Sequence, residues 1–210
     1  MKRLRAWVPL LILCPSARLP AQPTVKITSP KDGAVVSSGR PLVVTVDAAP
    51  AAFQGVVILG DGPIGSDVLK SPPYRFEIPI PPQTASRRYT FVAVGILQPG
   101  GSADSDPVTV DIERPDDPAR LMSALSTIGF DYVGHYVPLI VTGVFSDGSH
   151  VDLTRSTRTT YVSDTPAVAT VDANGVVTGV RPGSARITIR SGGRTLVVPV
   201  TVANRRLPAK

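Results

Sequence analysis

The sequence predicts an all-β protein built from two β-sandwiches in tandem, and three observations support this fold class. Val and Thr, which favour strands, are plentiful, as are the turn formers, with 18 Gly and 22 Pro, whereas helix formers such as glutamate and lysine are scarce. From Thr24 onward, short apolar or alternating runs are separated by clusters of Gly, Pro, Asn and Asp, and no long stretch repeats its apolar residues with the period of a helix. A polar segment with two prolines, ERPDDPA at 113–119, divides the chain into two halves.

The N-terminus, residues 1–21, is predicted to be a cleaved secretory signal peptide. A basic start (KRLR, 2–5) precedes a short apolar run at 6–14, and small and turn-forming residues follow. The apolar run is far shorter than the roughly 20 residues needed to cross a bilayer, so no transmembrane span is predicted. Cleavage is expected after Ala21, with Ala17 as the alternative site. A buried N-terminal helix is the competing interpretation.

Cys14 offers an alternative fate for the exported chain. The segment LILC (11–14) resembles a bacterial lipoprotein box, in which the cysteine is lipidated and becomes the first mature residue. Leu13 is large for the position before such a cysteine, and Pro15 is unusual after it. A lipid anchor at Cys14 would attach the protein to a membrane surface, and it stays an alternative to free export.

Removal of the signal changes what the composition implies. The signal contains four of the 22 Lys and Arg residues and none of the 16 Asp and Glu residues, so the net charge falls from +6 to +2. The basic character of the chain therefore belongs largely to the signal, and no nucleic-acid partner is predicted. The only Cys and the only Trp are also removed. The exported protein must then fold without disulfides, on two cores of about 90 residues each.

The first domain is predicted to span residues 24–113. Its strands are expected at 25–28, 41–48, 54–60, 74–78, 88–96 and 107–112, with a further edge opening at 64–65. A total of about seven strands is the number expected for a small Greek-key sandwich. Glu77 alternates with aromatic residues on an expected edge strand, where a charge discourages pairing with other chains.

These segments resemble a bacterial immunoglobulin-like repeat found in many secreted proteins. The likeness is carried by the opening VKITSPKDGAV (25–35), by DGPIG (61–65), by SPPYRF (71–76) and by the aromatic strand YTFVAV (89–94). It implies an immunoglobulin-like sandwich for the first half. Relatives often carry an acidic residue after the aromatic strand, where this sequence has GIL (95–97), so the resemblance does not imply a calcium site there.

The second domain is predicted to span residues 120–203, after a linker at 114–119 that its prolines keep stiff and extended. A short polar tail is expected at 204–210. Residues 137–145 and 150–153 are expected to form a hairpin around an Asp-Gly turn. Further strands are expected at 167–171, 176–180, 185–189 and 195–202.

The string SDTPAVATVDANGVVTGVRPGSARITI (163–189) resembles the bacterial immunoglobulin-like domain of group 2, the repeat of intimin- and invasin-type adhesins. The likeness extends over about 121–202. It implies a second Greek-key sandwich and a role in adhesion, in which such repeats often serve as stalks. Tyr161 stands where many members have Trp, and we expect it to bury its ring and to find a partner for its hydroxyl.

Calcium is the metal for which the sequence offers candidate ligands. Asp104 and Asp106 precede the last strand of the first domain, and Asp116 and Asp117 lie in the linker. If the two pairs came together, their oxygens would supply the ligands that calcium prefers and would set the angle between the domains. The alternative is that these aspartates cap turns and solvate the linker.

No other residues form a recognisable site. His150 and Asp152 share one face of a strand, but a metal would need further ligands. No nucleophile elbow, phosphate-binding loop or zinc motif is present, so neither catalytic residues nor a cofactor is predicted. Four arginines at 181, 186, 190 and 194 are a candidate patch for an anionic surface, although Arg186 and Arg190 are expected to form the solvated face of a strand.

The sequence therefore predicts an exported, non-catalytic module that acts in binding, adhesion or spacing at the cell envelope. Its location is expected to be secreted, periplasmic or at the cell surface, and its partner a protein or polysaccharide of the envelope. The alternative is a periplasmic or extracellular subunit or accessory protein that binds a partner protein or polysaccharide. The loss of the only Trp counts against sugar binding on a flat aromatic platform.

Overall fold

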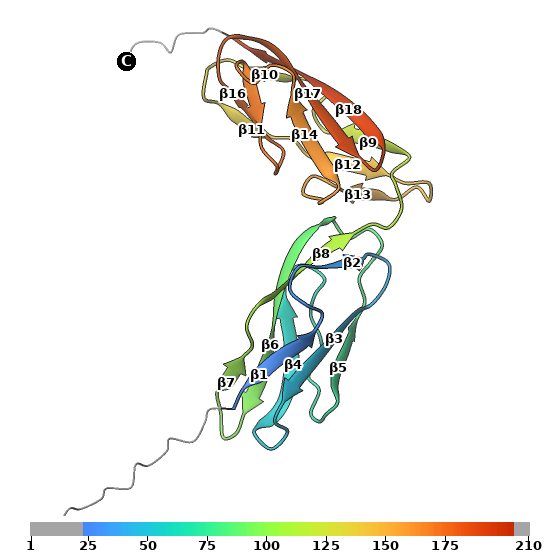
Figure 1. Ribbon diagram of the computed structural model, residues 1–210, viewed down its shortest axis with the longest axis vertical. Helices are drawn as coiled ribbons and strands as arrows, with labels where there is room; N and C mark the ends of the chain where they lie inside the picture. The colour runs from blue at the N-terminus through green and yellow to red at the C-terminus, as the bar shows by residue number, and fades with distance from the viewer. Residues whose placement is uncertain (1–22, 204–210) are drawn as a thin grey trace, which may run out of the picture.

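The computed structural model describes residues 23–203, which form eighteen β-strands and no helix (Figure 1). The predicted signal peptide, Cys14 and the polar tail lie outside the described residues. Within residues 23–203 there is accordingly no helix with the length and apolarity needed to cross a membrane. Two separate hydrophobic cores confirm the prediction of an all-β chain with two tandem sandwiches.

Two sheets pack face to face in the first domain. Its strands are β1 (Val25–Ser29), β2 (Ala34–Ser37), β3 (Leu42–Ala48), β4 (Phe53–Gly60), β5 (Tyr74–Ile78), β6 (Arg87–Leu97), β7 (Ser102–Asp104) and β8 (Val108–Glu113). One sheet has the order β1-β3-β5, and the other has the order β2-β8-β6-β4 with β7 beside β6. The pairing of β6 with both β4 and β8 is antiparallel, as a Greek-key sandwich requires.

Alternation along the strands builds the first core. In β5, Tyr74, Phe76 and Ile78 are buried while Arg75 and Glu77 are exposed, because successive side chains of a strand point to opposite faces. Phe91 in β6 is 1% exposed and is among the largest fully buried side chains. Strand β5 lies at the edge of its sheet, as predicted from its charged residues.

The second domain has ten strands, most of them only three or four residues long. They are β9 (Arg120–Ser123), β10 (Ile128–Phe130), β11 (Tyr136–Pro138), β12 (Val141–Val144), β13 (His150–Asp152), β14 (Thr159–Ser163), β15 (Ala169–Val171), β16 (Val176–Gly179), β17 (Gly183–Ser191) and β18 (Arg194–Val202). The sheets have the orders β10-β18-β17-β14, β13-β12-β9 and β11-β16-β15. Ile187 and Ile189 are fully buried between them, whereas Arg186 and Arg190 point outward as predicted.

The expectation of one strand over 137–145 was wrong. Residues 136–138 form β11, which pairs with β16, and residues 141–144 form β12, which pairs with β9 and β13. Between them Leu139 is fully buried, and its backbone N–H donates to the carbonyl of Gly175. The chain changes sheets at this point, so a continuous apolar run serves two sheets.

Candidate functional site

Within residues 23–203, an extended network of hydrogen bonds and ion pairs lies where the two domains meet, between β8 and β13 (Figure 1). The predicted linker, 114–119, leaves β8 and runs along the second domain. Pro118 is buried, and its carbonyl accepts a hydrogen bond from the Arg194 Nε at 3.1 Å. The N–H of Ala119 donates to the carbonyl of Val144 at 2.8 Å. The end of the linker is therefore bonded to the second domain and is not surrounded by water.

Glu113, the last residue of β8, reaches across to the second domain. It is 6% exposed, although glutamate is among the residues least often buried. One carboxylate oxygen, Oε2, accepts from the Ser156 hydroxyl at 2.7 Å. The other, Oε1, accepts from the backbone N–H of Thr157 at 2.7 Å and from its hydroxyl at 3.1 Å. Both oxygens are thus satisfied by groups of the neighbouring domain, which is the condition for burying a charge without a large penalty.

Arg114, which follows directly, binds both domains at once. Its Nη1 donates to the carbonyl of Pro82 in the first domain at 3.3 Å and to the Ser149 hydroxyl in the second at 3.2 Å. Its Nη2 donates to Asp147 Oδ2 at 2.6 Å. The guanidinium carbon lies 4.6 Å from the centre of the Phe145 ring, within the range of a cation–π contact. Glu113, Arg114 and these partners are called the junction clamp below.

Further hydrogen bonds between the second domain and either the first domain or the linker reinforce the junction clamp. The N–H of Ser86, in the first domain, donates to the carbonyl of Asp152 in the second at 2.8 Å. Arg158 donates from Nη1 to the carbonyl of Arg114 at 3.1 Å and from Nη2 to the Asp117 carboxylate. The space left among these residues is about 10 Å³, close to the minimum that holds one water molecule. The junction clamp itself is therefore packed and leaves no room for a ligand among these residues.

Asp147 makes the junction clamp sensitive to acid. The Ser149 hydroxyl, the Arg114 guanidinium and the Ser149 backbone N–H all favour its charged form and hold the pKa of this carboxyl well below its usual range. A carboxyl whose pKa is lowered by folding stabilises the folded state above its unfolded pKa of about 3.9, and this contribution is lost as the pH falls through the folded pKa.

We therefore expect the stability difference between the wild type and Asp147→Asn to depend on pH. The wild type should be more stable at pH 7, where Asp147 is charged in both folded and unfolded states and only the folded state provides its partners. The difference should shrink steadily below about pH 4. Urea unfolding in steps from pH 7 to pH 2 measures it, and a difference that is constant over this range would contradict the assignment.

The structure does not bring the two predicted aspartate pairs together. Asp104 and Asp106 line an open groove with Thr24 and Lys26, and β7 lies at the end of the first domain opposite the junction (Figure 1). Asp116 is an ion-pair partner of Arg114, with 3.5 Å between Oδ2 and Nε, and Asp117 pairs with Arg158.

Arginine thus occupies the position that a cation at the junction was expected to take. No group of three or more His, Cys, Asp or Glu residues within 23–203 is arranged to hold a metal. Calcium binding by Asp104, Asp106, Asp116 and Asp117 stays a prediction.

The candidate arginine patch is not compact. Arg181 precedes β17 and Arg194 follows the turn after it, so the two lie at opposite ends of a strand of nine residues, about 30 Å apart. Arg194 is engaged with the linker, as described above. His150 and Asp152 share the exposed face of β13, as expected. His135 packs edge-on against Tyr132, with 5.3 Å between ring centres.

Tyr161 behaves as the sequence suggested. It packs against the second core, and its hydroxyl donates to the carbonyl of Thr154 at 2.9 Å. Burial, with smaller effects from Asp152 and Asp172, raises the pKa of this phenol above its ordinary value, so it stays a neutral donor. Its role is structural.

Comparison with known proteins gives a family match for part of the second domain. Residues 157–204 match the family model Big-like, described as a bacterial Ig-like domain. This match supports a bacterial Ig-like domain. The matched range includes β14 to β18. It also includes Thr157, which donates to Glu113, and Arg158, which donates to Asp117. No curated protein matches the chain.

Solved structures with related folds are only distantly similar. Fibronectin(III)-like modules of CbhA from Clostridium thermocellum are 21% identical over 42% of this chain and 94% of that chain, with a TM-score of 0.37. Domains 4 and 5 of the S-layer protein SbsC are 18% identical over 85% of this chain and 97% of that chain, with a TM-score of 0.36. A β-glucuronidase from Parabacteroides merdae is 14% identical over 86% of this chain and 24% of that chain, with a TM-score of 0.37. None of these likenesses bears on function.

Proposed function

We propose that the chain is an exported, non-catalytic module whose two immunoglobulin-like domains act as one rigid unit in binding, adhesion or spacing at the cell envelope. The observation that carries the proposal is the junction clamp. Domains joined by a linker ordinarily move relative to one another unless the contact between them is specific and well packed. Here the buried carboxylate of Glu113, in the first domain, accepts hydrogen bonds from the second domain, and the buried guanidinium of Arg114 binds both domains.

The chemistry of the junction supports rigidity over simple tethering. Separating the domains would leave Glu113 without its three hydrogen bonds from Ser156 and Thr157, and would return both Glu113 and Arg114 to water. Hydrogen bonds to charged groups contribute more than those between neutral groups. Several such bonds acting together favour one interdomain arrangement, which suits a spacer or a platform that presents loops at a fixed angle.

The finer parts of the proposal follow from the sequence. Residues 24–113 and 120–203 are the proposed domain limits, the second domain belongs to group 2 of the bacterial Ig-like domains, and the first is another bacterial Ig-like repeat. Residues 1–21 direct export to the periplasm, the cell surface or the medium. The partner is a protein or polysaccharide of the envelope, and the β-sandwiches present their surfaces to it without catalysing a reaction.

Small-angle scattering tests the rigidity directly. The wild type should give scattering that one two-domain arrangement reproduces. Arg114→Ala removes the guanidinium that joins Pro82, Ser149 and Asp147, so its distribution of interatomic distances should broaden. Arg181→Ala, which changes an exposed arginine away from the junction, is the matched control and should leave the scattering unchanged.

Circular dichroism of Arg114→Ala should keep the strand signal of the wild type, since Phe145 is the one clamp residue that also belongs to a hydrophobic core and the substitution leaves its side chain in place. Scattering from the wild type that requires a broad ensemble of domain orientations would contradict the proposal. So would an Arg114→Ala variant whose scattering matches that of the wild type.

A further inference from the structure

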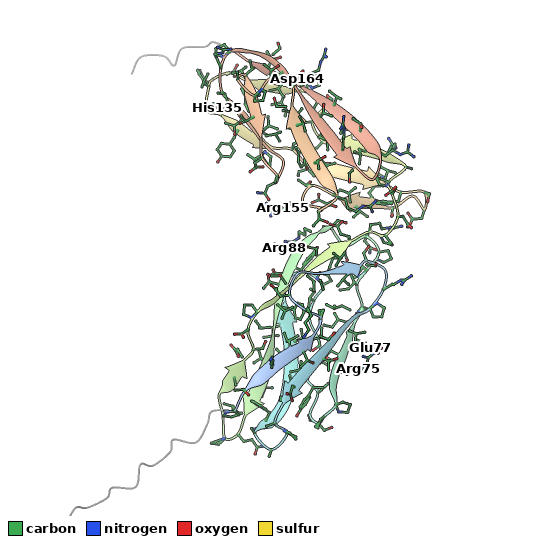
Figure 2. The ribbon with its side chains drawn as sticks, in the orientation of Figure 1. Arg75, Glu77, Arg88, His135, Arg155 and Asp164 are labelled. Carbon is green, nitrogen blue, oxygen red and sulfur yellow. The ribbon has the colours of Figure 1, made fainter. Side chains whose placement is uncertain are left out.

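A groove between the domains lies beside the junction clamp. It consists of two adjoining hollows of about 340 and 320 Å³, which share Arg87, Arg155 and Asn174 as lining residues. Arg87 belongs to β6 of the first domain, while Arg155 and Asn174 belong to loops of the second. Each hollow has the size of a small-molecule site. Figure 2 shows Arg88 and Arg155 on facing sides of the junction.

Three arginines give this groove its charge. Arg88 is paired with Asp111, with Nε to Oδ1 at 3.0 Å and Nη2 to Oδ2 at 3.1 Å, so its charge is largely neutralised. The Arg87 guanidinium lies over the Tyr89 ring, 4.3 Å from its centre, and this side chain donates no hydrogen bond to a described residue. Arg155 is exposed and has neither a hydrogen bond nor an ion pair with any residue in 23–203. Two guanidinium groups of the groove are therefore free to bind an anion.

The acidic groups along the groove are already engaged. Asp111 is held by Arg88, as described above. Asp152 Oδ1 accepts from the backbone N–H of Thr154 at 2.8 Å and from its hydroxyl at 2.6 Å. Asp152 keeps its negative charge, so the three arginines and two aspartates that line the two hollows give a net charge of +1, and neither Arg87 nor Arg155 is paired with a carboxylate of the described chain. A guanidinium presents planar pairs of donors that match carboxylate and phosphate oxygens.

The remaining lining suits a sugar better than a base. The Asn174 side-chain amide offers donors and an acceptor for ring hydroxyls, and the Thr157 hydroxyl, which donates to Glu113, can still accept. Pro138 and Ile140 offer apolar surface for the face of a pyranose. No aromatic residue within 23–203 lines the two hollows, and the Tyr89 ring, which Arg87 covers, is 3% exposed. Stacking platforms for single-stranded nucleic acid are exposed aromatic rings, and this groove provides none among the described residues.

We propose that this groove binds an acidic polysaccharide, with a carboxylate or phosphodiester group of the polymer held between Arg87 and Arg155. The inference rests on the proposed envelope function and names its ligand class. Because one arginine comes from each domain, the site exists only in the arrangement that the junction clamp maintains. Rigidity of the pair would thus serve recognition as well as spacing.

Calorimetric titration of the two-domain protein tests the proposal. The probes are a galacturonic acid tetramer, which presents carboxylates, a glycerol phosphate oligomer, which presents phosphodiesters, and a neutral galactose tetramer. We expect one of the two anionic probes to bind with one site per protein and to weaken as salt is added, and the neutral tetramer to bind at least 10-fold more weakly.

Variants assign the binding to the groove. Arg155→Gln removes an exposed, unpaired charge and should fold normally, while weakening the anionic probe about 10–100-fold, the loss expected for charge-assisted hydrogen bonds. Arg181→Gln removes the same charge elsewhere and should bind as the wild type does. Absence of binding by both anionic probes, or equal losses in the two variants, would overturn the proposal. A wild type that is rigid in scattering but fails to bind would overturn the groove assignment alone and leave the proposed rigid module intact.

Discussion

Replacing Glu113 by alanine is expected to lower the free energy of unfolding by about 2–4 kcal/mol, because it removes a buried acceptor of three hydrogen bonds. The hydroxyl of Ser156, which is 6% exposed, and the N–H of Thr157 would lose their charged partner. Alanine also leaves unfilled space at a contact where only about 10 Å³ is open. Urea unfolding followed by circular dichroism measures the loss.

Glu77 provides the matched control. It is the other glutamate of the described chain, and its side chain is 62% exposed beside Arg75 on β5, away from the junction (Figure 2). Exposed ion pairs of this kind contribute between 0 and about 1 kcal/mol, so Glu77→Ala should unfold almost as the wild type does. Equal losses for the two glutamate variants would mean that the contacts of Glu113 across the junction add nothing to stability.

Most strands were predictable because their signal is local. In β5 and β17 the buried and exposed residues alternate one by one, and such a pattern is visible in five to nine consecutive residues. The Asp-Gly turn between β12 and β13 and the Gly-Gly turn between β17 and β18 carry their own residue preferences. Fold class follows from these local signals, since many short strands joined by such turns have few alternatives to a sandwich.

Two of the strands that escaped prediction, β2 and β10, occupy equivalent places in the two domains. Each is short, and each pairs in parallel with the last strand of its own domain: Ala34 lies opposite Val110, and Ile128 lies opposite Val200. A segment of three or four residues is too short to show alternation, and a parallel partner more than 70 residues away leaves no turn signal beside it. In both domains the chain thus moves from one sheet to the other near its start.

The junction could not be predicted from its residue types. Glu113 and Arg114 belong to a polar, proline-containing segment, and charged residues in such a segment are ordinarily solvated. What buries them is a set of partners, Asp147, Ser149, Ser156 and Thr157, that lie 33 to 44 residues farther along the chain. The sequence did suggest that charged groups would set the interdomain angle. We expected aspartates and a calcium ion to set this angle, because the residues that hold Arg114 at the junction are far from it in the sequence.

Gly192 is the position where a single methyl group should damage the junction most. It forms the two-residue turn between β17 and β18 with Gly193, at φ of +52° and +71°. A Cβ at residue 192 would lie 2.6 Å from Pro118 Cδ and 2.8 Å from Asp117 Oδ1, so the linker would have to move. We expect Gly192→Ala to cost about 1–2 kcal/mol for a left-handed backbone and about 1–3 kcal/mol more for the overpacking, measured by urea unfolding.

Gly193→Ala separates these two costs. Its φ is also positive, but a Cβ there has no atom within 4 Å, so only the backbone cost of about 1–2 kcal/mol applies. Scattering should then broaden for Gly192→Ala, because a displaced Pro118 loses its bond from Arg194, and should not change for Gly193→Ala. If both variants lost the same stability and kept the scattering of the wild type, the linker would be moving aside from residue 192 at no energetic cost. A linker that moves so easily could not keep the two domains in one fixed arrangement.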